Sequence, residues 1–210
     1  MNKTVAALPA MTERRSGARV LEPTALYDAE QIRARIDELS SALNRRLPAD
    51  GTPHLVAVLK GGFMFLADLV RAMRRPITVD FVRIASYGSG TTPARAPRIS
   101  QEPEMPLGDR DVVIVEDIVD TGETLAVLRQ RILSERPASL TTVALLTKPS
   151  RRRTDVPIEL AGFVVDNGFV VGYGLDLDER FRHLPFLALV DPLEGVRRDE
   201  ERRRHGQTTL

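Results

Sequence analysis

The stretch VVIVEDIVDTGETL, residues 112–125, combines an apolar run, a group of acids and the start of a helical pattern. Its first four residues are all β-branched, as is typical of a central strand in a parallel sheet. Glu116 and Asp117 follow directly, and the helical pattern begins near Thr121. In an open α/β sheet, ligands bind beyond the carboxyl ends of the strands, which is where this order places the acids. The stretch therefore predicts an α/β fold with a ligand site at the end of this strand.

The segment Asp120-Thr-Gly-Glu-Thr has the composition of a phosphate-binding turn. Gly122 allows close approach of the backbone to a ligand, and the hydroxyls of Thr121 and Thr124 lie beside the amide groups of a helix start. Carboxylates next to a phosphate site would repel it unless they bind sugar hydroxyls, a metal or developing positive charge. A simpler interpretation is a capping box formed by Asp120 and Glu123, although capping leaves Glu116 and Asp117 unexplained.

Strand and helix patterns alternate along the rest of the chain. Asp28 and Gln31 predict a capping box that opens an amphipathic helix ending at Pro48. We expect a long irregular loop from Tyr87 to Arg110, because the segment is rich in Gly, Thr, Pro and Ser. The alternation favours a mostly parallel central sheet flanked by helices. The further strands are expected at 54–59, 77–86, 140–147, 158–165, 169–175 and 185–190, with helices at 63–73 and 121–135.

Composition excludes several classes of function. The chain has 210 residues, a formal net charge of +1 and no cysteine. The absence of cysteine excludes disulfides and thiolate chemistry. The near-neutral charge gives no overall electrostatic field that would attract nucleic acid. No apolar run approaches the roughly 18 residues of a membrane span. We expect a flexible arm at 1–22, one domain at 23–196 and a charged flexible tail at 197–210. We therefore expect a cytoplasmic protein that binds neither nucleic acid nor a membrane.

The stretch from Val112 to Leu125 resembles the phosphoribosyl-pyrophosphate signature of the type I phosphoribosyltransferases. Further segments, in the same order as in the family, resemble its hypoxanthine-guanine branch. They are VLKGGFMFLADL (58–69), SYGSGTT (86–92), LLTKP (145–149) and FVVGYGLDLDERFR (169–182). The resemblance implies a small hood formed by the N- and C-terminal segments and a mobile active-site loop. It also implies a magnesium-dependent purine salvage enzyme that makes IMP or GMP and pyrophosphate from hypoxanthine or guanine and phosphoribosyl pyrophosphate.

The family's roles carry over to the acids of the signature. Glu116 and Asp117 would bind the ribose hydroxyls and favour the oxocarbenium-like sugar, and Asp120 would be the general base at N7 of the purine. Thr121, Gly122, Glu123 and Thr124 would hold the 5′-phosphate through backbone amides, with the Glu123 side chain capping the helix.

Other segments would bind pyrophosphate, base and metal. Lys60, Gly61 and Gly62 match the pyrophosphate loop, in which the family has a non-proline cis peptide just before the lysine. Arg182 matches the pyrophosphate-binding arginine, and Asp176, with Glu116 and Asp117, the acids near Mg²⁺. Lys148 would donate to the 6-oxo group, Phe169 would stack on the purine, and the backbone of Val170 would read its edge. Ser86 and Tyr87 begin the segment that resembles the family's lid.

Two alternatives remain at the level of sequence. One is a relative with the same fold that prefers xanthine or guanine, which the geometry around Val170 and Asp176 would distinguish. Separately, Leu177 stands where the family often has an aromatic residue, so the shape of the base pocket stays open. The other is a regulator that binds phosphoribosyl pyrophosphate only as an effector while contacting RNA or DNA. The near-neutral charge and the presence of both Asp120 and Lys148 argue against the regulator. The resemblance also implies a homodimer or homotetramer.

Overall fold

The computed structural model describes residues 23–85, 97–166 and 168–190. Its larger sheet has six strands in the order β4-β3-β2-β5-β6-β7. The five strands other than β4 run parallel, and β4 pairs antiparallel with β3. This arrangement confirms the predicted mostly parallel α/β sheet. The strands are β2 (His54–Leu59), β3 (Thr78–Ala85), β4 (Arg98–Gln101), β5 (Asp111–Val119), β6 (Ser139–Thr147) and β7 (Leu160–Val164).

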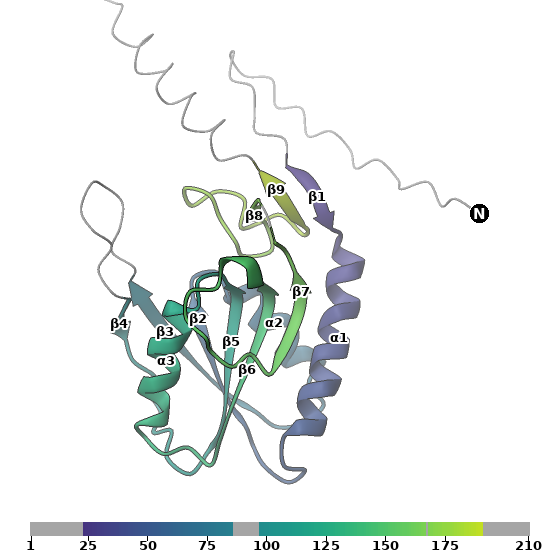
Figure 1. Ribbon diagram of the computed structural model, residues 1–210. Coiled ribbons are helices and arrows are strands. Elements are labelled where there is room, and N and C mark those ends of the chain that lie inside the picture. Colours follow the sequence, from purple (N-terminus) through teal and green to yellow (C-terminus); the bar gives the residue numbers. More distant parts are fainter. Residues whose placement is uncertain (1–22, 86–96, 167, 191–210) are drawn as a thin grey trace, which may run out of the picture.

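The helices cover both faces of this sheet because its central strands are apolar on both faces. In β5, Val113 and Val115 pack in one core cluster with α1 (Ala29–Arg46) and α2 (Phe63–Ala72). Val112 and Ile114 pack in the other cluster with α3 (Glu123–Leu133). Figure 1 shows α1 and α3 on opposite sides of the sheet. Within the described ranges, no helix combines the length and apolar character needed to cross a bilayer.

A second sheet forms the predicted hood from the two ends of the described chain. It has three strands in the order β1-β9-β8, all antiparallel. They are β1 (Thr24–Tyr27), β8 (Phe169–Val171) and β9 (Leu187–Val190). The small sheet lies above the six-stranded sheet in Figure 1. This position brings the segment between β8 and β9 close to the loop that joins β2 to α2.

Local sequence patterns account for most element boundaries. The capping box at α1 is present, with the Asp28 side chain accepting from the Gln31 amide and the Gln31 side chain accepting from the Asp28 amide. The expectation of an irregular loop through 87–110 was wrong in part, because Arg98–Gln101 forms β4. This strand has one large apolar residue, Ile99, so no apolar run marks it in the sequence. The predicted arm, the tail and the start of the lid lie outside the described residues.

Candidate active site

The acids at the end of β5 are held in a dry environment. Glu116 is buried, and its Oε2 atom has no hydrogen-bond partner. Burial, with the neighbouring Asp117 adding to it, raises the pKa of Glu116 well above its ordinary value. Burial also raises the pKa of Asp117 to about 6, while a hydrogen bond from the Ile118 amide at 2.8 Å opposes the rise. A buried carboxylate next to a half-buried one forms a site that favours a positive charge.

The turn between β5 and α3 has the backbone of a phosphate cradle. Gly122 has φ +87°, and a Cβ atom there would lie 2.6 Å from the carbonyl oxygen of Thr154, so only glycine fits without strain. α3 begins at Glu123, directly after this glycine. The first amide groups of a helix have no partner within the helix, so that of Thr124 is available to an anion. The Thr121 hydroxyl accepts from the Glu123 amide at 3.4 Å.

The expected capping box at Asp120 and Glu123 was wrong. Gly122 is the residue before the helix and has no side chain that could cap this end. In a capping box the extended residue just before the helix lies three positions before its partner. Here the left-handed Gly122 holds that position, so Asp120 and Glu123 cannot form the box. The Glu123 side chain is exposed. The Asp120 carboxylate instead contacts Arg151, with 2.9 Å between Oδ1 of Asp120 and Nε of Arg151.

Lys148 lies close to this turn and is buried, which is uncommon for a lysine. Its amide donates to the carbonyl of Val119, and its Nζ donates to the carbonyl of Gly168 at 2.7 Å. The pKa of Lys148 is lowered, chiefly by burial. The Asp120 carboxylate opposes this shift, and the Arg151 guanidinium adds to it. The next residue after Gly168 is Phe169, which is partly exposed on β8, whereas Val170 is buried. The structure therefore brings the predicted base-binding residues to the same edge as Asp120.

The loop of Lys60, Gly61 and Gly62 lies against the end of β5. The peptide between Leu59 and Lys60 is cis, as the resemblance implied. A Cβ atom on Gly61 would lie 1.5 Å from Oδ2 of Asp117, so the absence of a side chain lets this carboxylate lie on the loop. A Cβ atom on Gly62 would lie 2.8 Å from the carbonyl oxygen of Val58. Neither glycine could carry a side chain without displacing the neighbouring atom.

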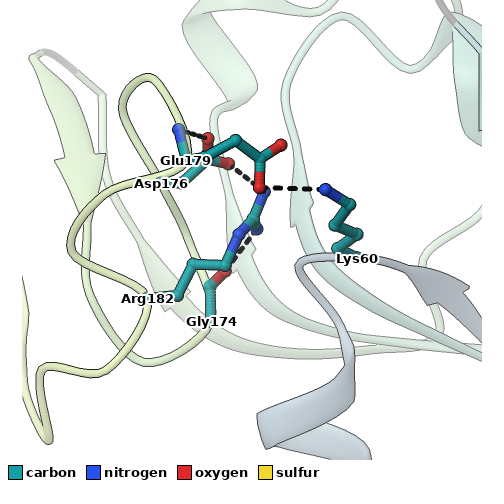
Figure 2. Close-up of polar contacts among 5 residues, drawn as sticks. All are labelled: Lys60, Gly174, Asp176, Glu179 and Arg182. Atoms are coloured by element: carbon teal, nitrogen blue, oxygen red, sulfur yellow. Dashed lines mark hydrogen bonds and ion pairs between the residues drawn. The ribbon is translucent and has the colours of Figure 1, made fainter.

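A cluster of charged side chains joins this loop to the segment between β8 and β9 (Figure 2). The Glu179 carboxylate contacts Nζ of Lys60 at 2.9 Å and Nη2 of Arg182 at 3.3 Å. Arg182 also contacts Oδ1 of Asp176 at 2.7 Å and donates to the carbonyl of Gly174 at 2.7 Å. The Arg182 guanidinium lowers the pKa of Asp117, whereas the Asp176 carboxylate raises it. The cluster therefore lies next to the acids of β5.

A magnesium site would rest on few protein ligands. Among the described residues, no group of three or more His, Asp or Glu side chains has the spacing of a metal site. Mg²⁺ usually keeps several waters and binds one or two carboxylates together with substrate phosphates, so a larger cluster is not required. The unpartnered Oε2 of Glu116 and the half-buried carboxylate of Asp117 supply oxygen ligands of the kind that Mg²⁺ prefers.

Sequence reasoning missed two residues that contact the predicted ones. Arg151 pairs with Asp120, and Glu179 pairs with both Lys60 and Arg182. Glu179 lies within the quoted segment 169–182, but nothing in its spacing indicates two cationic partners. The predicted lid residues Ser86 and Tyr87 lie outside the described residues.

Comparison with known proteins gives consistent matches. A family model described as a phosphoribosyl transferase domain matches residues 23–178. A hypoxanthine phosphoribosyltransferase of Salmonella typhimurium is 44% identical over 161 residues, covering 76% of this chain and 90% of that protein. A hypoxanthine-guanine phosphoribosyltransferase of Mycobacterium tuberculosis is 42% identical over 172 residues, covering 80% of this chain and 85% of that protein.

Solved structures agree. A crystal structure of a hypoxanthine-guanine phosphoribosyltransferase from Bacillus anthracis superposes with a TM-score of 0.75 at 33% identity, covering 82% of this chain and 99% of that one. A structure of the hypoxanthine phosphoribosyl transferase of Trypanosoma cruzi gives a TM-score of 0.78 at 35% identity, covering 87% and 100% of the two chains.

Proposed function

The chain belongs to the phosphoribosyltransferase family, in its hypoxanthine-guanine branch, and on that premise we propose how its residues carry out the reaction. The enzyme transfers the 5-phosphoribosyl group from phosphoribosyl pyrophosphate to N9 of hypoxanthine or guanine. The bond from C1′ of the ribose to the pyrophosphate oxygen breaks, and a bond from C1′ to N9 forms. The products are IMP or GMP and pyrophosphate.

One observation carries the assignment of roles. Three loops meet at the carboxyl end of β5: the Lys60 loop, the turn after β5, and the segment from Gly174 to Arg182. Gly61 lies against Asp117 on one side and against Gly174 on the other. A Cβ atom on Gly61 would lie 1.5 Å from Oδ2 of Asp117, and a Cβ atom on Gly174 would lie 2.3 Å from the carbonyl oxygen of Gly61. The meeting of cations, buried carboxylates and a helix N-terminus matches the groups of phosphoribosyl pyrophosphate.

The phosphate groups would bind at the two ends of this site. The turn from Thr121 to Thr124 would hold the 5′-phosphate through amide groups at the start of α3. Lys60 and Arg182 would hold the pyrophosphate, and the planar fork of arginine suits two phosphate oxygens. Because Glu179 contacts both cations, it would have to move aside when pyrophosphate binds.

The ribose would lie over the acids of β5. Glu116 and Asp117 would accept hydrogen bonds from its 2′- and 3′-hydroxyls, and their charge would stabilise the oxocarbenium-like transition state. We propose that Glu116, Asp117 and Asp176 would hold Mg²⁺ directly or through water, and that the ion would supply positive charge to neutralise the departing pyrophosphate. A positive ion there would also keep Glu116 and Asp117, whose pKa values are raised by burial, in the ionised form.

Base recognition would rest on Lys148. A buried ammonium donates to a 6-oxo group but opposes the 6-amino group of adenine, so the wrong base leaves one N–H of this buried ammonium without an acceptor. Phe169 would stack on the purine, and the backbone at Val170 would read its edge. Asp120 would take the proton at N7 after its contact with Arg151 opens.

The remaining assignments are proposals of the same kind. Residues 23–196 would form one domain with an arm and a tail, and the segment that begins at Ser86 and Tyr87 would close over the site. The protein would work in the cytoplasm as a homodimer or homotetramer, as the family resemblance implies.

Replacement of Asp120 tests the proposed base most directly. Asp120→Ala should lower kcat by roughly 10²- to 10⁴-fold while the midpoint of thermal unfolding changes little, because general base catalysis contributes a factor of that size. Asp37→Ala removes an exposed acid on α1, away from this turn, and is the control. A rate within twofold of the unmodified enzyme would remove Asp120 from the base role.

A further inference from the structure

Tyr173 has a buried side chain with a partner on another element. It stands between Gly172 and Gly174 in the segment after β8, with φ +49°, and it belongs to the main core cluster. Its hydroxyl donates to the carboxylate of Asp68 on α2. None of the roles proposed above uses this contact.

The contact joins the two halves of the proposed pyrophosphate site. Asp68 lies on the helix that directly follows the Lys60 loop. Tyr173 directly precedes Gly174, whose amide donates to the carbonyl of Arg182 at 3.0 Å and whose carbonyl accepts from the Arg182 side chain at 2.7 Å. A shift of Tyr173 would therefore carry Arg182 with it.

The two segments also touch through their backbones. A Cβ atom on Gly174 would lie 2.3 Å from the carbonyl oxygen of Gly61, so no side chain separates them. The exposed contact of Glu179 with Lys60 also joins the two segments, but it would have to open when pyrophosphate binds. The hydrogen bond from Tyr173 to Asp68 involves neither of the two cations, so it can persist when pyrophosphate binds. Burial raises the pKa of Tyr173, so its hydroxyl stays a donor at neutral pH.

We propose that Tyr173 and Asp68 form a positioning pair that holds Arg182 at the right distance from Lys60 to bind pyrophosphate. The inference rests on the pyrophosphate role proposed above for Lys60 and Arg182. Neither member of the pair touches substrate. Their effect should appear in the affinity for phosphoribosyl pyrophosphate and for pyrophosphate, and leave the affinity for the base unchanged.

The test is Tyr173→Phe, which keeps the buried ring and removes only the hydroxyl. We expect the KM for phosphoribosyl pyrophosphate to rise roughly three- to tenfold, the range that loss of one hydrogen bond gives. The KM for hypoxanthine should stay within about twofold. Tyr27→Phe is the matched control. It removes a hydroxyl from a tyrosine of the hood that stacks on Phe163 of β7, and it should change neither KM.

Variants of Asp68 separate positioning from simple stabilisation. Asp68→Ala should raise the same KM as Tyr173→Phe, and the double variant should be no worse than Asp68→Ala alone, because both changes remove the contact between Asp68 and Tyr173. Asp68→Ala also removes the exposed pair with Arg71, which lies outside the site. Asp68→Asn keeps an acceptor oxygen and should restore most of the affinity. Asp68 is partly exposed, so its replacement should be tolerated in folding.

Lys60→Ala, assayed in parallel, distinguishes the two possible failures. A raised KM for phosphoribosyl pyrophosphate in Lys60→Ala, with no change in Tyr173→Phe beyond a lower unfolding temperature, would overturn the positioning role alone. An unchanged KM in Lys60→Ala would overturn the pyrophosphate assignment and this inference with it.

Discussion

Asp117→Asn should make the metal-free protein more stable while removing most of its activity. Burial raises the pKa of Asp117 from its ordinary 3.8 to about 6. Each unit of difference between the folded and unfolded pKa corresponds to about 1.4 kcal/mol, so the ionised carboxylate costs the folded state at most about 3 kcal/mol. Asparagine keeps an oxygen that accepts from the Ile118 amide and carries no charge.

The pH dependence fixes the sign of this effect. Below about pH 4 Asp117 is protonated in both states and contributes nothing. Between about pH 4 and 6 the unfolded state releases its proton first, so the free energy of unfolding falls as pH rises, and above about pH 6 the penalty is constant. The gain from Asp117→Asn should therefore be about 1–3 kcal/mol at pH 7.5 and near zero at pH 4.

Urea unfolding from pH 4 to pH 8 in the presence of a chelator measures this difference. Asp37→Asn removes the same charge from an exposed position on α1 and should give no comparable gain. Adding magnesium and phosphoribosyl pyrophosphate should stabilise the unmodified protein more than the variant. A variant that is no more stable at pH 7.5, or a difference that does not vary with pH, would refute the reasoning, because the charge would then be compensated in the folded protein.

Lys148→Ala should reduce the preference for hypoxanthine over adenine by at least about tenfold in kcat/KM, and unchanged discrimination would reassign the 6-oxo contact. Glu179→Gln should tighten pyrophosphate binding on the order of two- to fivefold in calorimetry at low salt, since the exposed carboxylate no longer competes for the two cations. Asp178→Asn is its neighbouring control, and equal effects would point to net charge alone. Gly174→Ala should raise the KM for phosphoribosyl pyrophosphate at least about tenfold, because φ is +98° and the new Cβ would clash with the lysine loop. Gly108→Ala, where the nearest atom would be 3.2 Å away, should leave this KM unchanged; the opposite order would contradict the role of the close approach.

Local patterns in the sequence were sufficient for the sheet and its main helices. The β-branched run of β5 and the capping box at Asp28 depend on neighbours in the chain, and the structure has both. The strands β1 and β4 were missed because each has only four residues and little apolar patterning. Their pairing depends on partners far away in sequence, so a local pattern does not reveal it.

The candidate site shows the same difference between local patterns, which the sequence reveals, and long-range contacts, which it does not. Motif order placed Glu116, Asp117 and Lys148 at one end of the sheet, and the structure brings them there. The contacts of Asp120 with Arg151 and of Glu179 with Lys60 join residues far apart in the chain, and no spacing rule connects them. The capping box expected at Asp120 failed because Gly122 adopts a left-handed turn that the Asp-x-x-Glu pattern does not reveal.

The transfer reaction itself is the most direct test of this account. The purified protein would be assayed spectrophotometrically with phosphoribosyl pyrophosphate and magnesium, offering hypoxanthine, guanine, xanthine, adenine and uracil in parallel. We predict rapid formation of IMP or GMP that a chelator abolishes, with no turnover of adenine or uracil. Tight binding of phosphoribosyl pyrophosphate without turnover of any base would contradict the account and would indicate a regulator that retains the fold.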